Sequence, residues 1–181
     1  MKICIVGPSG AGKTTIANKL AKELKIPAHA FDEIYWDLSG TEFVKNSEET
    51  ISLGIKQIML QDNWILEGAY DKRLLPLLLE CSLILKMEVP LYLRTMRLLQ
   101  RYLESVVTGK RPKETLKNTI ELIQYSYSFD KRLENFLSSN NQLSRKVISF
   151  NNFSKAINII ETVFKNNLSD SLNRNDRTKE G

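Results

Sequence analysis

A glycine-rich stretch runs from Gly7 to Thr14, directly after the apolar run of residues 3–6. It reads Gly-Pro-Ser-Gly-Ala-Gly-Lys-Thr and matches the phosphate-binding pattern G-x-x-x-x-G-K-[ST] at every position. The glycines allow backbone dihedrals that a side chain would forbid, so that successive N–H groups point at phosphate oxygens. The pattern therefore predicts a phosphate loop, residues 7–14, between a buried strand and a helix whose positive N-terminal end faces the same anion.

The two last residues of the pattern have distinct chemical roles. We expect Lys13 to reach the β- and γ-phosphates of a bound nucleotide and the Thr14 hydroxyl to ligate Mg²⁺. The flanking sequence fits this context, because residues 2–6 form a β-rich run and Ile16 begins an apolar stripe at helical spacing. The sequence thus predicts a nucleotide-binding protein that uses Mg²⁺ as its metal.

Length and composition favour one soluble domain. The 181 residues suffice for a three-layer α/β core, and no apolar run approaches the roughly 20 residues that span a bilayer. Cys4 and Cys81 lie in apolar runs and are expected to be buried, reduced thiols. Because Met1 leads directly into the first strand, we expect no signal peptide and a cytoplasmic location.

Strand-like and helix-like segments alternate along the chain, which predicts a parallel sheet with helices on both faces and the nucleotide at the carboxyl ends of the strands. After the phosphate loop, the expected strands lie near residues 28–31, 63–68, 82–87 and 146–150. A loop is expected over residues 38–46, and two separate helices between residue 116 and residue 137. Apolar residues become rare from residue 166 to residue 181, where a flexible tail is expected.

Three further sets of residues are candidates for chemistry. Glu67 ends a predicted strand, where it either holds Mg²⁺ through water or is an ordinary surface carboxylate. Asp32 follows the second strand and either orients an acceptor hydroxyl as a base or caps a helix. The helix after Pro90 carries Arg94, Arg97 and Arg101 on one side, which suits either a triphosphate or a solvated face.

The charge of +5 is concentrated in the second half of the chain. Residues 86–146 contain twelve Lys and Arg against six Asp and Glu. Such an excess either surrounds a triphosphate or contacts DNA. The second possibility defines an alternative function, a nucleotide-binding regulator that contacts DNA through a basic surface, although the sequence has no recognised DNA-reading motif.

With these motifs placed, residues 1–165 resemble the adenylate-kinase-like branch of phosphate-loop kinases. More narrowly, they resemble the small bacterial DNA topology modulation (FlaR-related) proteins. The resemblance is carried by Gly-Pro-Ser-Gly-Ala-Gly-Lys-Thr-Thr at 7–15, Phe-Asp-Glu-Ile-Tyr-Trp at 31–36, Trp-Ile-Leu-Glu-Gly-Ala-Tyr at 64–70, and Pro90 followed by Arg97 and Arg101.

The resemblance implies a phosphate-loop NTPase fold with a five-stranded parallel sheet of order 2-3-1-4-5. It also implies an acceptor-binding insert near residues 32–62 and a lid near residues 103–115 that contains Lys110 and Arg111. By the same resemblance Arg97 stacks on adenine and Arg101 contacts phosphates. The implied ATP site comprises Gly7, Pro8, Ser9, Gly10, Ala11, Gly12, Lys13, Thr14, Thr15, Arg97 and Arg101.

The chain departs from nucleoside monophosphate kinases in the insert. Those enzymes bind the acceptor phosphate with arginines there, whereas residues 26–70 of this chain contain two lysines and no arginine. We therefore expect an ATP-dependent phosphotransferase whose acceptor is a neutral or weakly charged hydroxyl compound, unless Arg73 reaches an anionic one. Lys13, Arg101 and Asp32 are the expected catalytic residues. The expected acceptor-binding residues are Asp32, Trp36, Tyr70 and Arg73, with Trp36 either stacking on the acceptor or packing in the fold.

Overall fold

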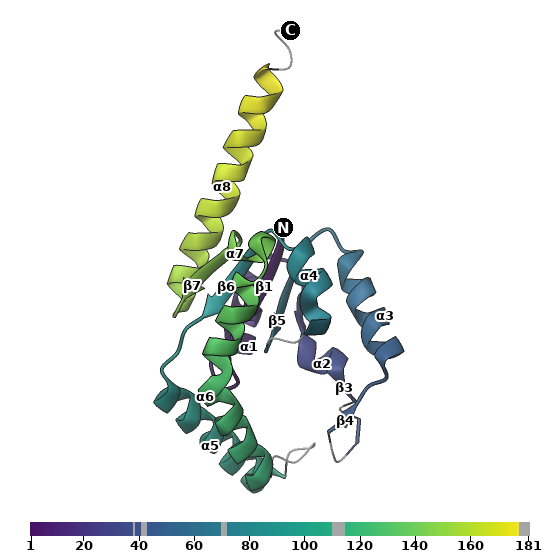
Figure 1. Ribbon diagram of the computed structural model, residues 1–181, viewed down its shortest axis with the longest axis vertical. Helices are drawn as coiled ribbons and strands as arrows, with labels where there is room; N and C mark the ends of the chain where they lie inside the picture. The colour runs from purple at the N-terminus through teal and green to yellow at the C-terminus, as the bar shows by residue number, and fades with distance from the viewer. Residues whose placement is uncertain (38, 41–42, 70–71, 110–114, 178–181) are drawn as a thin grey trace.

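The core of the protein is a five-stranded parallel sheet, seen in a computed structural model (Figure 1). The structure describes residues 1–37, 39–40, 43–69, 72–109 and 115–177, with side chains as far as residue 165. The strands lie in the order β2-β5-β1-β6-β7. Their bounds are β1 Lys2–Val6, β2 Ala28–Ala30, β5 Trp64–Gly68, β6 Leu83–Met87 and β7 Val147–Phe150.

This order is the predicted one. The labels differ because two short strands, β3 (Trp36–Asp37) and β4 (Val44–Lys45), intervene in the chain and pair as a separate antiparallel hairpin. Counted without them, the strands of the main sheet run 2-3-1-4-5. The three-layer, phosphate-loop α/β fold expected from the sequence is confirmed.

Alternating side chains of the strands bury into two separate cores, one on each face of the sheet. Ile3 and Ile5 of β1 face the core beneath α1 (Lys13–Leu24) and α8 (Phe153–Arg177). Cys4 and Val6 face the opposite core, which also holds Trp64. That core is covered by α3 (Glu48–Met59), α4 (Leu75–Glu80), α6 (Leu116–Ser138) and α7 (Asn141–Ser144).

The remaining elements stand at the carboxyl end of the sheet. A short helix, α2 (Phe31–Tyr35), follows β2, and a 3₁₀ turn, η1 (Lys72–Leu74), precedes α4. Helix α5 (Leu91–Thr108) packs against α6 at the lower end of Figure 1. None of the helices among the described residues is apolar over a length sufficient to cross a membrane.

Two local predictions from the sequence were wrong. Part of the expected loop 38–46 pairs as the β3–β4 hairpin. The two helices expected between residues 116 and 137 form one continuous helix, α6. Its N-terminus is fixed by Thr115, whose hydroxyl accepts a hydrogen bond from the N–H of Asn118.

The expected domain boundaries stay predictions. The insert near residues 32–62 contains α2, the β3–β4 hairpin and α3. The expected lid includes residues 110–114, which lie outside the described residues. Helix α8 continues past residue 166 to Arg177, so the start of the expected tail falls within a helix.

A test of the fold is the close approach of α2 to β5 at Gly68. A Cβ at Gly68 would lie 2.9 Å from the Cβ of Phe31. We expect Gly68→Ala to lower the free energy of unfolding by about 1–3 kcal/mol, because the two elements must separate to admit the methyl group. Chemical denaturation followed by circular dichroism measures this change. An unfolding midpoint equal to that of the wild type would contradict the close packing of α2 on β5.

Candidate functional site

The phosphate loop connects β1 to α1 with two residues in the left-handed backbone region. Gly10 has φ +77° and Gly12 has φ +95°, a conformation that a side chain would strain. Gly10 also lies so close to α5 that a Cβ there would stand 2.7 Å from the carbonyl oxygen of Arg94. Because α1 begins at Lys13, its N-terminal N–H groups are positioned at the loop, as anion binding requires.

Lys13 is buried beneath the loop. Its Nζ donates a hydrogen bond to the carbonyl oxygen of Pro8 at 3.1 Å. Burial lowers the pKa of Lys13 below its ordinary value, the nearby carboxylates of Glu67 and Asp32 oppose this shift, and the positive charge of Arg101 adds to it. The structure therefore gathers Lys13, Glu67, Asp32 and Arg101 into one electrostatic group, although they are far apart in the sequence.

The Thr14 hydroxyl donates a hydrogen bond of 2.6 Å to Oε1 of Glu67. Glu67 is the penultimate residue of β5 and has only 6% of its surface exposed, so the surface-carboxylate interpretation does not apply. Burial raises the pKa of Glu67, while Lys13 and the Thr14 hydroxyl lower it in part. A hydroxyl and a carboxylate in contact form an oxygen donor set of the kind that Mg²⁺ prefers, and these two residues fit the metal site expected from the sequence.

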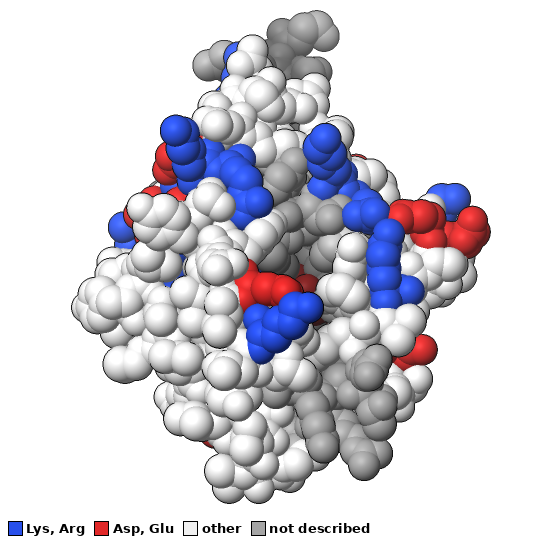
Figure 2. Space-filling view, turned by 60° about the horizontal axis from the view of Figure 1, so that its bottom comes forward, with Lys and Arg blue, Asp and Glu red and all other residues white. Residues whose placement is uncertain are grey.

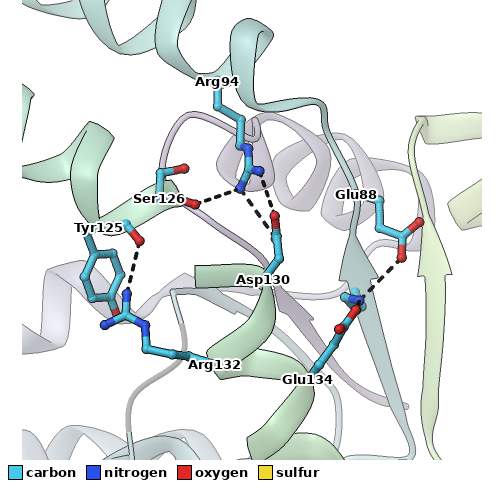
Figure 3. Close-up of polar contacts among 8 residues, drawn as sticks. Glu88, Arg94, Tyr125, Ser126, Asp130, Arg132 and Glu134 are labelled. Atoms are coloured by element: carbon cyan, nitrogen blue, oxygen red, sulfur yellow. Dashed lines mark hydrogen bonds and ion pairs between the residues drawn. The ribbon is translucent and has the colours of Figure 1, made fainter. Parts of the chain in front are cut away.

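The three arginines of α5 have different partners. Arg97 donates from Nη1 to the carbonyl oxygens of Gly10 and Ala11, at 3.3 and 2.8 Å, and so contacts the phosphate loop itself. Arg94 is buried and turned toward α6, where its Nη2 lies 2.7 Å from Oδ2 of Asp130 (Figure 3). The Arg94 side chain therefore links α5 to α6 rather than to the phosphate loop.

Beside the loop lies a cavity of about 610 Å³, which we call the Asp32 cavity. It brings together three residues singled out from the sequence, namely Asp32, Trp36 and Arg101, with Ser9 of the phosphate loop. Its other lining residues are Phe43, Asn118, Glu121, Leu122 and Tyr125. Figure 2 looks at this end of the molecule and shows charged side chains of both signs around its centre.

The wall contributed by α6 was missed in the sequence. Asn118, Glu121 and Tyr125 recur at spacings of three and four, which places them on one side of a helix. This spacing predicts that the three side chains lie on one side of a helix. It does not predict which other element that side of the helix faces. Their place in the cavity follows from the packing of α6 against α5.

Arg73 lies elsewhere. Its guanidinium binds the Glu48 carboxylate at 2.8 and 2.9 Å and stacks over the ring of Tyr35, 5.4 Å from the centroid. Hydrogen bonds from Arg73 and Lys45 lower the pKa of Glu48 to about 2. Arg73 lines a separate cavity of about 300 Å³ against α3. The structure does not bring it to the Asp32 cavity, and Tyr70 lies outside the described residues.

Two cations of the basic excess in residues 86–146, Lys86 and Arg94, are buried and paired with carboxylates of the protein. Nζ of Lys86 lies 2.6 Å from Oε1 of Glu134 and 3.5 Å from Oε1 of Glu88. Together with the Arg94–Asp130 pair, these contacts join β6 and α5 to α6 (Figure 3). These cations therefore support the fold around the site rather than form an open basic surface.

Comparisons with known proteins agree with the fold. The model of the ATPase family associated with various cellular activities (AAA) matches residues 3–69, less than half of the chain. No curated protein sequence matches this chain. Among solved structures, the shikimate kinase of Acinetobacter baumannii in complex with shikimate is 17% identical, with a TM-score of 0.57 over 91% of this chain and 93% of that one.

Two further shikimate kinases give the same result. The Bacteroides thetaiotaomicron enzyme is 14% identical with a TM-score of 0.57, over 91% of this chain and 98% of its own. The Aquifex aeolicus enzyme is 15% identical with a TM-score of 0.53, over 93% and 98%. At these identities the likeness establishes the fold, which these kinases share with the present chain.

The buried carboxylate gives a test that needs no substrate. Because the pKa of Glu67 is higher in the folded protein than in the unfolded chain, the folded state holds this proton more tightly, and its stability falls as pH rises through that interval. Glu67→Gln removes the titrating group, so we expect the variant to be more stable than the wild type at neutral pH in the absence of nucleotide and metal. Thermal unfolding between pH 4 and pH 8, a range that brackets the ordinary pKa of about 4.3, measures the difference.

The matched control is Glu80→Gln. Glu80 is exposed, and its pKa is lowered by a hydrogen bond from Lys2, so the same substitution there brings no gain at neutral pH. An equal change in thermal stability for the two variants at neutral pH would contradict the inference that burial of the ionised Glu67 carboxylate destabilises the free protein.

Proposed function

We propose that this protein is an ATP- and Mg²⁺-dependent phosphotransferase that moves the γ-phosphoryl group of ATP to a hydroxyl group of a small molecule bound in the Asp32 cavity. The observation that carries the proposal is the 2.6 Å contact of Thr14 with Glu67 next to buried Lys13. It lies beside a cavity that holds both a carboxylate, Asp32, and a guanidinium, Arg101. The kinase fold of the neighbouring structures is consistent with this chemistry.

On the nucleotide side, the loop amides and α1 bind the phosphates, and Lys13 and Arg101 neutralise charge on the transferring phosphoryl group. Thr14, with Glu67 through water, holds Mg²⁺, which when bound supplies further neutralisation of the phosphate oxygens. Arg97 already contacts the loop carbonyls, and it stacks on the adenine when the nucleotide is bound.

On the acceptor side, Asp32 accepts the proton of the acceptor hydroxyl as its oxygen bonds to the γ-phosphorus and the bond from that phosphorus to the β,γ-bridging oxygen breaks. Among the described residues that line the Asp32 cavity, Arg101 is the one Lys or Arg. Because Arg101 serves the phosphoryl group and Arg73 binds Glu48, the acceptor is a neutral hydroxyl compound. Trp36, Phe43 and Tyr125 provide rings for it to pack against.

The resemblance of residues 1–165 to the adenylate-kinase-like branch, and more narrowly to DNA topology modulation proteins, supports a cytoplasmic kinase. Regulation of DNA topology is the second role suggested by that resemblance. The internal pairing of Lys86 and Arg94 favours the kinase, because it removes these charges from any DNA-binding surface.

The test is ADP release from Mg-ATP against a panel of nucleosides, nucleoside monophosphates and small metabolite alcohols. We expect one neutral hydroxyl compound to accelerate the reaction, and Lys13→Ala to lower kcat by roughly 10²–10³-fold, as loss of a transition-state charge contact does. Phosphorylation of AMP at a rate like that of an adenylate kinase would contradict the acceptor class. A flat panel with tight ATP binding would contradict the kinase, and duplex DNA would then be the next ligand.

The role of Asp32 has its own test. We expect Asp32→Asn to lower kcat with that acceptor by roughly 10²–10⁴-fold, the range of general base catalysis, while the Kd for Mg-ATP stays close to that of the wild type. Isothermal titration and steady-state kinetics measure the two quantities. Asp62→Asn, at the opposite end of β5, is the matched control and keeps full activity. An unchanged kcat in Asp32→Asn would contradict a catalytic role for Asp32.

A further inference from the structure

Helix α5 has its apolar side turned to solvent. Six large apolar side chains on it are between 41% and 85% exposed, and we call them the outer stripe: Tyr92, Met96, Leu99, Leu103, Val106 and Val107. A surface helix of a globular protein ordinarily shows the reverse, with its apolar side on the core and polar residues outward. The arrangement indicates that something covers this helix.

The opposite side of α5 carries its arginines. At 3.6 residues per turn, the outer stripe occupies roughly 100° of the helix circumference, and Arg94, Arg97 and Arg101 fall on the far side. The contacts agree with this placement, because Arg94 binds Asp130 and Arg97 binds the phosphate loop. The polar side of α5 is thus used by the protein body, which leaves the apolar side outward.

The outer stripe has the spacing of a helix-pairing surface. Positions 92, 96, 99, 103 and 106 alternate in steps of four and three, the pattern of a helix that packs along another helix. The residues that border this seam are uncharged, namely Thr95, Gln100 and Tyr102. Two identical helices can therefore approach along the stripe without like-charge repulsion.

The size of the patch fits a dimer. Large apolar side chains exposed to this extent each present on the order of 100 Å², so the outer stripe offers roughly 600 Å², the lower limit per partner of a stable interface of standard size. Neighbouring α6 adds Leu116, Ile120 and Tyr127, all exposed. The lower left of Figure 2, where this end of the molecule comes forward, is almost free of charged side chains.

We propose that a second copy of this chain covers the outer stripe, with α5 packed against α5 of its partner about a two-fold axis near Leu99. A two-fold interface needs a surface that complements itself, and a straight apolar seam with uncharged borders meets this need. A membrane surface fits less well, because a helix that lies on lipid directs Lys and Arg to the headgroups, whereas the arginines of α5 face the protein body.

Sedimentation velocity of the full chain over a range of concentrations tests the proposal. We expect the wild type to be a dimer and Leu103→Glu to be a monomer, with the dimer Kd raised on the order of 100-fold or more, because each copy would bury a carboxylate in an apolar seam. The matched control is Leu53→Glu on α3. Leu53 is 58% exposed, close to the 60% of Leu103, and its substitution leaves the dimer intact.

A cross-linking experiment does not depend on how the glutamate variant folds. Under mild oxidation Leu99→Cys forms an intermolecular disulfide, whereas Leu53→Cys does not, and the native Cys4 and Cys81 are buried. A wild type that is monomeric at every concentration would overturn the proposal, as would dimers that persist in Leu103→Glu. Binding of the wild type to phosphatidylglycerol vesicles in place of self-association, lost in Leu103→Glu, would overturn it in favour of a membrane.

Discussion

The candidate site is centred on a buried ammonium held near a buried carboxylate. Lys13 and Glu67 expose 9% and 6% of their surfaces, and either charge alone would be costly to bury because it loses its hydration. The parallel register sets Ile5 beside Glu67 and Val6 beside Gly68. The strand that leads into the phosphate loop and the strand that carries the carboxylate therefore end at the same level. The pairing of β1 with β5 therefore brings the phosphate loop and Glu67 to the same edge of the sheet.

The protein alone compensates these charges incompletely. Burial lowers the pKa of Lys13 and raises the pKa of Glu67, although each charge opposes the shift of the other. A bound anion would complete the surroundings of Lys13, and a bound cation those of Glu67. This residual cost in the free protein is the physical reason to expect phosphate and metal to bind together. The phosphate would supply negative charge beside Lys13, and the metal would supply positive charge beside Glu67.

The features that could be predicted best from the sequence are those set by residues close together in the chain. The phosphate loop and the strand-end position of Glu67 follow from residues next to each other in the chain, and the alternation of elements gave the sheet. Arg94 and Arg73 show the limit. Helical spacing placed Arg94 beside Arg97 and Arg101, but their partners are chosen by packing, and Asp130 lies 36 residues away from Arg94 in the sequence. Glu48, which binds Arg73, lies on α3, and no local sequence pattern indicates that α3 packs beside Arg73.

Helix α5 shows how one element can serve several demands. Its polar side must supply Arg97 to the loop carbonyls, Arg101 to the Asp32 cavity and Arg94 to Asp130. In an amphipathic helix the apolar side lies opposite the polar side. Because the polar side of α5 contacts the rest of the protein, its apolar side faces outward. The exposed stripe is thus linked to the arginine side by helical geometry. A partner that packs on the stripe would restrain the same helix that Arg97 fastens to the phosphate loop, so that self-association and nucleotide binding would act on one rigid element.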